Sequence, residues 1–176
     1  ECDGYVGIYT DKWRASGGPR AGEPWTQSMI LNTLLTHYEA TGDDRVLAFA
    51  KTAAASTMSF FDPVDGENPF VGDIEGSQLY GHNLYFVEPL LWLHELTGDQ
   101  AYVDFAVSCY DRYRAGSIRW LEADGFIENL TNPDVPMIAH GAHTAVQIRI
   151  PLLLLRATGD DRWREAARAG FEKIQR

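Results

Sequence analysis

The segment HYEATGDDRVL (residues 37–47) contains a Thr-Gly-Asp tripeptide that returns at residues 97–99 and 158–160. The three copies begin 56 and 61 residues apart, so the chain of 176 residues carries a long internal repeat. Glycine readily adopts the left-handed conformation that ends a helix, and the aspartate after it can cap the next helix. Each copy therefore predicts a tight turn between two antiparallel helices.

An apolar segment precedes each turn, and a segment with apolar residues on only one helix face follows it. This pattern predicts an all-α protein with helical hairpins at about 24–60, 81–114 and 139–176. The preceding helices are apolar nearly all round and are expected to be inner helices. The following helices are expected to be outer helices with an apolar face. That face comprises Val46, Phe49 and Ala53 in the first hairpin, and Trp163, Ala167 and Phe171 in the third.

An inner layer of helices wrapped by an outer layer is typical of an α/α toroid. Three hairpins make about half of an (α/α)6 barrel, so residues 1–176 are predicted to form a single partial α/α-barrel domain. Short ribbons at Val64–Val71 and Ile118–Ile127 are the most β-structure that the sequence permits.

The composition excludes several classes of protein. A net charge of −10 argues against nucleic acid or an anionic membrane surface as a partner, since both require a basic patch. The longest apolar run, Ile150–Leu155, is too short to cross a membrane. Cys2 and Cys109 are too few for a disulfide framework, and Cys109 is expected to be a buried apolar residue. We expect a cytoplasmic rather than a secreted protein.

The connections between hairpins indicate where function lies. The links at about 61–80 and 115–138, and the loop-like stretch before Pro24, all enter an inner helix at its start. They are therefore expected at one end of the toroid, and long loops in compact domains are usually functional.

One register of residues falls at this end. Thr26, His82 and His143 each lie fifteen residues before the Thr of a Thr-Gly-Asp turn, which places them in the first turn of an inner helix. Helix starts offer unpaired N–H groups to polar ligands, while aromatic and amide side chains suit a sugar. The predicted sugar-binding residues are His82, His143, His140, Trp25, Gln27 and Asn83. His37 and His94, near the short turns, are expected to be structural.

A second register contains Asn32, Glu88 and Arg149, and Glu88 is expected to pair with Arg149 in a structural role. The carboxylates of the long links are expected to be solvated surface groups. They are Asp73, Glu75, Glu122, Asp124 and Glu128.

Four stretches together resemble the β-L-arabinofuranosidase family. They are DGYVGIYTDKWR (3–14), the stretch from WTQSMILNTLL to AFAKTAA (25–54), GHNLYFVEPLLWLHELTGDQAYVDFA (81–106), and the stretch from HGAHTAVQIRI to AGFEKI (140–174). The resemblance implies an (α/α)6 glycoside hydrolase that acts on arabinose-containing glycans with retention, through a zinc-bound cysteine nucleophile and a glutamate acid/base. It also implies that His82, and His143 or His140, bind the sugar.

The family's cysteine cluster belongs to a later part of its chain, and Cys2 and Cys109 do not match it. We therefore expect no cofactor within this chain, zinc only in a longer protein, and a catalytic half that is missing here. No catalytic residue is predicted.

Two other interpretations remain open. The chain could be part of another α/α-barrel carbohydrate enzyme, such as an unsaturated uronyl hydrolase or a sugar epimerase, in which His and Asp do acid/base work. Alternatively, the hairpins could form a helical-repeat scaffold that binds peptide on its concave face. A half toroid also has open apolar edges, which predict self-association or pairing with a missing half.

Overall fold

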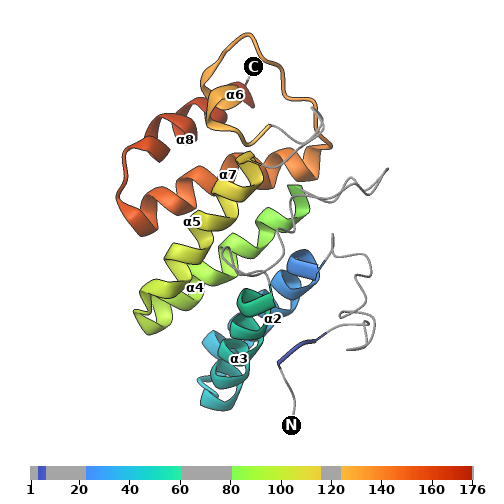
Figure 1. Cartoon of the computed structure of the whole chain (residues 1–176), viewed down its shortest axis with the longest axis vertical. Coiled ribbons are helices and arrows are strands. Elements are labelled where there is room, and N and C mark those ends of the chain that lie inside the picture. Colours follow the sequence, from blue (N-terminus) through green and yellow to red (C-terminus); the bar gives the residue numbers. More distant parts are fainter. Residues whose placement is uncertain (1–3, 7–22, 61–80, 116–123, 176) are drawn as a thin grey trace.

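The computed structural model describes residues 4–6, 23–60, 81–115 and 124–175, and it confirms the all-α fold (Figure 1). Within these ranges no strand is present. The helices are α2 (Glu23–Thr41), α3 (Asp44–Phe60), the 3₁₀ helix η1 (Gly81–Phe86), α4 (Val87–Thr97), α5 (Gln100–Ala115), α6 (Ile127–Thr131), α7 (Gly141–Thr158) and α8 (Arg162–Lys173). Of the two proposed ribbons, Val64–Val71 lies outside the described residues. The described part of the second, 124–127, is a turn that leads into α6.

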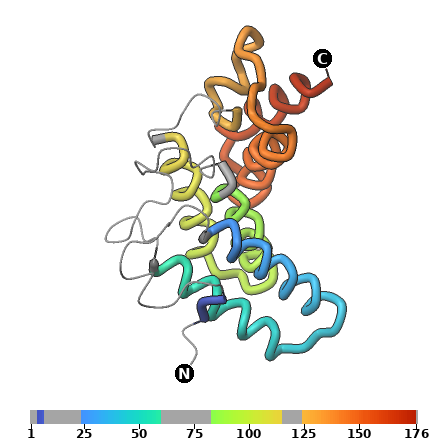
Figure 2. Tube along the Cα trace, turned by 90° about the vertical axis from the view of Figure 1, so that its right-hand side faces the viewer, coloured from blue at the N-terminus to red at the C-terminus, as the bar shows by residue number. Residues whose placement is uncertain are grey.

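The three predicted hairpins are present and follow one another along the molecule (Figures 1 and 2). The closest packing is within the pairs α2/α3, α4/α5 and α7/α8. Helix α4 also packs against both α2 and α7, so α2, α4 and α7 form the inner layer. Helices α3, α5 and α8 each cover one inner helix from outside.

The Thr-Gly-Asp turns are built alike. Gly42, Gly98 and Gly159 have φ angles of 67°, 73° and 66°, and each donates its N–H to the carbonyl four residues earlier at 2.7–2.9 Å. The next aspartate accepts the N–H two residues later, at 2.9–3.0 Å, at the start of the outer helix. Each threonine hydroxyl donates to its own helix at 2.7–2.8 Å. Only two or three residues separate the paired helices.

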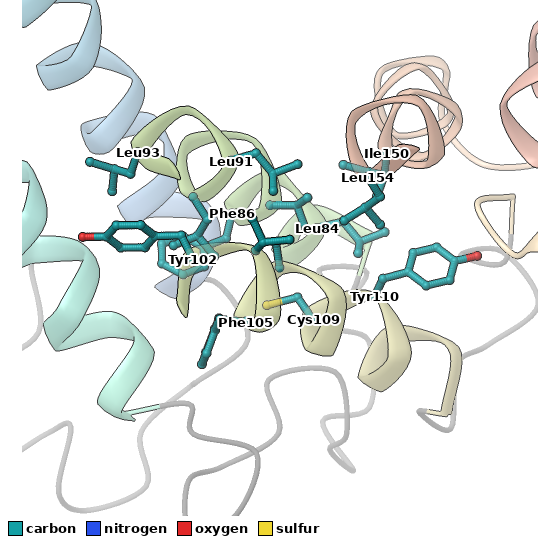
Figure 3. Close-up of a cluster of buried hydrophobic side chains, with 14 of the residues drawn as sticks. Leu84, Phe86, Leu91, Leu93, Tyr102, Phe105, Cys109, Tyr110, Ile150 and Leu154 are labelled. Atoms are coloured by element: carbon teal, nitrogen blue, oxygen red, sulfur yellow. The ribbon is translucent and has the colours of Figure 1, made fainter. Parts of the chain in front are cut away.

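The core lies where the inner helices meet each other and their outer partners (Figure 3). Its largest buried side chains include Phe86, Leu90, Tyr110, Ile150 and Trp163. The Trp163 ring stands edge-on to Tyr110, with ring centroids 4.8 Å apart, and joins α8 to α5.

Cys109 is buried in this core, which confirms the expectation for that residue. Burial raises the pKa of its thiol to about 12, because the thiolate cannot be solvated there. Cys109 is therefore an apolar packing residue, not a nucleophile.

The predicted outer-helix faces are partly wrong. Ala53 and Trp163 are buried as expected, but Phe49 is 37% exposed and Phe171 is 60% exposed. The buried faces of the outer helices consist of small residues, most of them one position before or after the predicted ones. They are Ala50, Ala54 and Thr57 in α3, and Ala166 and Gly170 in α8. Small side chains let the outer helix approach its inner partner closely, and this leaves the two phenylalanines on the flank.

Two details of the connections also differ from expectation. The link at 115–138 was expected to be a loop, but it contains α6, which packs against α8. The second inner helix begins as the 3₁₀ helix η1 and becomes α-helical only at Val87. Pro89 has no N–H to bond the preceding turn, which favours the change at this point. None of the helices in the described ranges is long and apolar enough to cross a membrane.

The turns make a prediction for stability. Among the described residues, no atom lies within 4 Å of a Cβ built on Gly98, so Gly98→Ala meets a conformational penalty and no clash. We expect a loss of about 1–2 kcal/mol in the free energy of unfolding, measured by urea denaturation, because alanine resists the left-handed conformation.

Gly141→Ala is the matched control. Gly141 opens α7, has equally open surroundings and lacks a positive φ, so its substitution should change stability by less than about 0.5 kcal/mol. Equal effects of the two substitutions would contradict the role given to the turn.

Candidate functional site

The starts of the inner helices come together at one end of the molecule. Helices α4 and α7 run parallel, and η1, which leads into α4, packs against both α2 and α7. The Tyr85 hydroxyl of η1 donates to the carbonyl oxygen of Ala142 in the first turn of α7, at 3.5 Å. The long links therefore enter at a shared end, as the sequence predicted.

Two of the predicted histidines lie beside each other at the start of α7. His140 is the N-cap residue, and its Nδ1 accepts the N–H of Ala142 at 3.4 Å. The His143 ring is half-buried, with its centroid 5.3 Å from that of His140. Burial lowers the pKa of His143 below its ordinary value, and the neighbouring His140 lowers it further. His143 is therefore a neutral imidazole at pH 7, with one donor and one acceptor nitrogen.

The other predicted site residues have different surroundings. Trp25 is 37% exposed in the first turn of α2. Gln27 and Asn83, both expected to contact a sugar, have fully buried side chains in this structure. The backbone of His82 lies in η1, but its side chain is outside the described residues.

Gln27 attaches the first part of the chain to the inner layer. Its Nε2 donates to the carbonyl oxygen of Val6 at 2.7 Å. Gly4 has a φ of 87°, and a Cβ on it would lie 2.6 Å from the carbonyl oxygen of Thr52 in α3. Residues 4–6 are thus held against α2 and α3, and only glycine fits at position 4.

The expected ion pair between Glu88 and Arg149 is present, and it joins α4 to α7. It is not alone. Two turns further along the same helices, Arg156 donates to Glu95 at 2.9 Å. On the other side of α4, Trp92 Nε1 donates to Glu39 of α2 at 2.8 Å. Glu95 and Arg156 are also 61 residues apart, so the same register extended by two turns would have revealed this pair.

Asp124 is not the solvated surface group that was expected. It is 5% exposed and accepts the N–H groups of Ile138 and Ala139 at 3.0 and 3.1 Å and the hydroxyl of Thr144 at 2.8 Å. Its carboxylate therefore folds the link over the start of α7. Glu128 is exposed and pairs with Arg114, as a surface group would. Asp73, Glu75 and Glu122 lie outside the described residues.

The same link is also held by a buried amide. Gln147 Oε1 accepts the N–H of Gly125 at 2.9 Å and the hydroxyl of Tyr113 at 3.1 Å. The Tyr110 hydroxyl donates to the carbonyl oxygen of Gly125 at 2.9 Å. A Cβ on Gly125 would lie 3.0 Å from the Cβ of Gln147, so a larger residue would fit only if Gln147 shifted by a few tenths of an ångström.

The described residues do not fit the zinc that the family resemblance implies for a longer protein. Across the described ranges, no three side chains of His, Cys, Asp or Glu gather closely enough to hold a metal ion. Cys109, the thiol that is described, is buried and protonated. No catalytic step through zinc can be derived from these residues.

Comparison with protein-family models, curated proteins and solved structures gives no match for this chain. The interpretation of function therefore depends on the residues of the site itself.

The burial of Asp124 can be tested by substitution. Asp124→Ala leaves three donors without their acceptor, and we expect a loss of about 2–3 kcal/mol in the free energy of unfolding. Glu128→Ala, which removes an exposed ion pair from the same link, should cost less than about 1 kcal/mol. Denaturation of both variants side by side would show whether the two carboxylates differ as proposed.

The surroundings of His143 predict its titration. In an NMR titration its pKa should lie below the ordinary histidine value, and His140→Ala should raise it, because one neighbouring charge is removed. Since the folded pKa is the lower one, this residue's contribution to stability is present above the ordinary pKa. It is lost as the pH falls through the folded value. A pKa above the ordinary value would contradict this description.

Proposed function

We propose that the end of the molecule formed by the starts of α2, η1 and α7 binds a carbohydrate. In this proposal the chain is the sugar-binding segment of an α/α-barrel glycoside hydrolase that resembles the β-L-arabinofuranosidases. The observation that carries the proposal is the grouping of Trp25, Tyr85 and His143 at the starts of adjacent inner elements. The catalytic acid and nucleophile are not among the residues assigned here.

These side chains have the chemistry that a sugar requires. A sugar ring has an apolar face, which can stack on an exposed indole such as that of Trp25, and a rim of hydroxyls that donate and accept hydrogen bonds. A neutral imidazole can donate a hydrogen bond to a sugar hydroxyl from one ring nitrogen and accept one at the other. The low pKa of His143 keeps it in that form at pH 7.

Support also comes from the structure that holds these groups. His143 follows an N-cap within a helix whose start is fixed by the buried Asp124, so its position is set by the fold. Gln27, two residues after Trp25, holds residues 4–6 through its hydrogen bond to Val6. Groups that are fixed before the ligand arrives lose little conformational entropy on binding.

Arg149 favours an acidic sugar as a second candidate ligand. Its side chain is 45% exposed beside Glu88, and its charge opposes the effect of burial on the pKa of Tyr85. A uronate carboxylate could accept hydrogen bonds from this guanidinium. This would agree with a uronyl hydrolase rather than an arabinofuranosidase.

Titration calorimetry of the full chain with L-arabinose and D-galacturonate tests the proposal. We expect saturable binding of one of these sugars. His82→Ala and His143→Ala should each weaken it at least tenfold, which corresponds to about 1.4 kcal/mol. A preference for galacturonate that disappears in Arg149→Gln would select the second candidate.

His37→Ala is the matched control, because His37 is an exposed histidine near the Thr-Gly-Asp turn at the opposite end of α2. It should bind sugar as the unaltered chain does. Absence of binding to both sugars would overturn the proposal, and equal loss in His37→Ala would show that the sugar binds elsewhere.

A further inference from the structure

A pocket of about 450 Å³ lies between the end of α8 and the link from α6 to α7, residues 132–140. In Figure 1 this link loops out at the end of the molecule where α6 and α8 pack together. The volume is within the range of small-molecule sites in proteins. Most of the lining is apolar, and these residues are Pro133, Val135, Pro136, Met137 and Ile174.

The polar groups of the lining come from Thr144 and Lys173. The Thr144 hydroxyl donates to the buried Asp124 carboxylate at 2.8 Å, so it is already used by the fold. Lys173 is the charged residue of the lining. Its Nζ donates to the carbonyl oxygen of Val135 at 2.7 Å and to that of Asn129. Both acceptors are neutral, so these bonds fix the ammonium beside a lining residue while it stays positively charged.

The wall formed by the link is held in place at several points. Lys173 bonds it at Val135, and Asp124 accepts the N–H groups of Ile138 and Ala139 at 3.0 and 3.1 Å. Two prolines fix backbone φ angles within it. A pocket whose walls are set before the ligand arrives loses little conformational entropy on binding.

The apolar side chains around this pocket remain accessible to water. Ile174 is 51% exposed, and Ile138, which follows the lining residue Met137, is 40% exposed. An apolar ligand in the pocket would remove such surface from water, which is favourable. A sugar would find few groups here for its hydroxyls, so the lining favours a hydrocarbon.

We propose that this pocket binds a small aliphatic carboxylate. The hydrocarbon chain lies against the prolines, Met137 and Ile174, and the carboxylate lies beside the Lys173 ammonium, which supplies the complementary charge. The adjacent Glu172 is paired with Arg168 of the same helix. The overall charge of −10 repels anions, so binding of a carboxylate depends on this local cation. The proposal is independent of the sugar site.

NMR of the full chain with 13C-labelled methionine methyl groups tests the pocket, because the chain has three methionines, Met29, Met58 and Met137. Titration with octanoate should move the Met137 signal saturably and leave the other two in place. Decanoate should bind more tightly, since each buried methylene improves affinity roughly fourfold. The uncharged 1-octanol should bind more weakly than octanoate. Absence of a saturable shift at Met137 would overturn the proposal, and so would equal binding of 1-octanol.

Ile174→Glu should weaken octanoate binding by roughly tenfold or more, because it removes apolar lining and adds a like charge. Phe171→Glu is the matched control: Phe171 is 60% exposed on the same helix and is not a lining residue, so this variant should bind octanoate as the unaltered chain does. Both positions are exposed, and circular dichroism should show unchanged helix content. An equal loss in the two variants would overturn the proposal.

The charge of Lys173 is tested separately. Lys173→Gln should abolish the preference for octanoate over 1-octanol, whereas Lys173→Arg, which keeps the charge, should retain it. Since Lys173 also holds the link, Lys173→Arg shows whether a loss comes from the charge or from a displaced link. A Lys173→Gln variant that still prefers octanoate would overturn the proposal, as would a Lys173→Arg variant without the preference.

Discussion

The fold depends on one conformational constraint, the left-handed glycine of the Thr-Gly-Asp turn. Gly42, Gly98 and Gly159 let the chain reverse within two or three residues, and the neighbouring Thr and Asp satisfy backbone groups on either side. Because each outer helix returns directly along its inner partner, all the inner helices run the same way. Their starts, and the links that lead into them, must then lie at one end. The location of the candidate site follows from the turns at the opposite end.

Parallel inner helices in register also explain the polar contacts between them. Glu88 with Arg149 and Glu95 with Arg156 join corresponding positions of α4 and α7, while Trp92 joins α4 to Glu39 of α2. The pairs are half-exposed, so each adds little to stability. These pairs specify the register in which adjacent inner helices pack. Among the described residues, helix α2 and helix α7 each have such contacts on one side only.

The site combines a stable framework with groups suited to a polar ligand. Asp124 and Gln147, both buried, fix the link that precedes α7, and His140 caps the helix that carries His143. Partial burial then keeps His143 neutral. In the proposal, the exposed indole and the neutral imidazole bind a sugar; nucleic acid as a ligand would need a basic surface rather than a net charge of −10.

Local sequence determined the all-α class, the three hairpins and the end at which the links gather, because turns and helix periodicity depend on neighbouring residues. It also indicated the pairing of Glu88 with Arg149, since a repeat places equal positions side by side. Only the tertiary structure decided which polar residues face solvent. Gln27 and Asp124 look accessible in the sequence, yet they are buried and bonded by segments distant in the chain, residues 4–6 and 138–144. The exposed Phe49 and Phe171 reflect the same limit: periodicity predicts an apolar face, but the closeness of helix packing decides which part of it is covered.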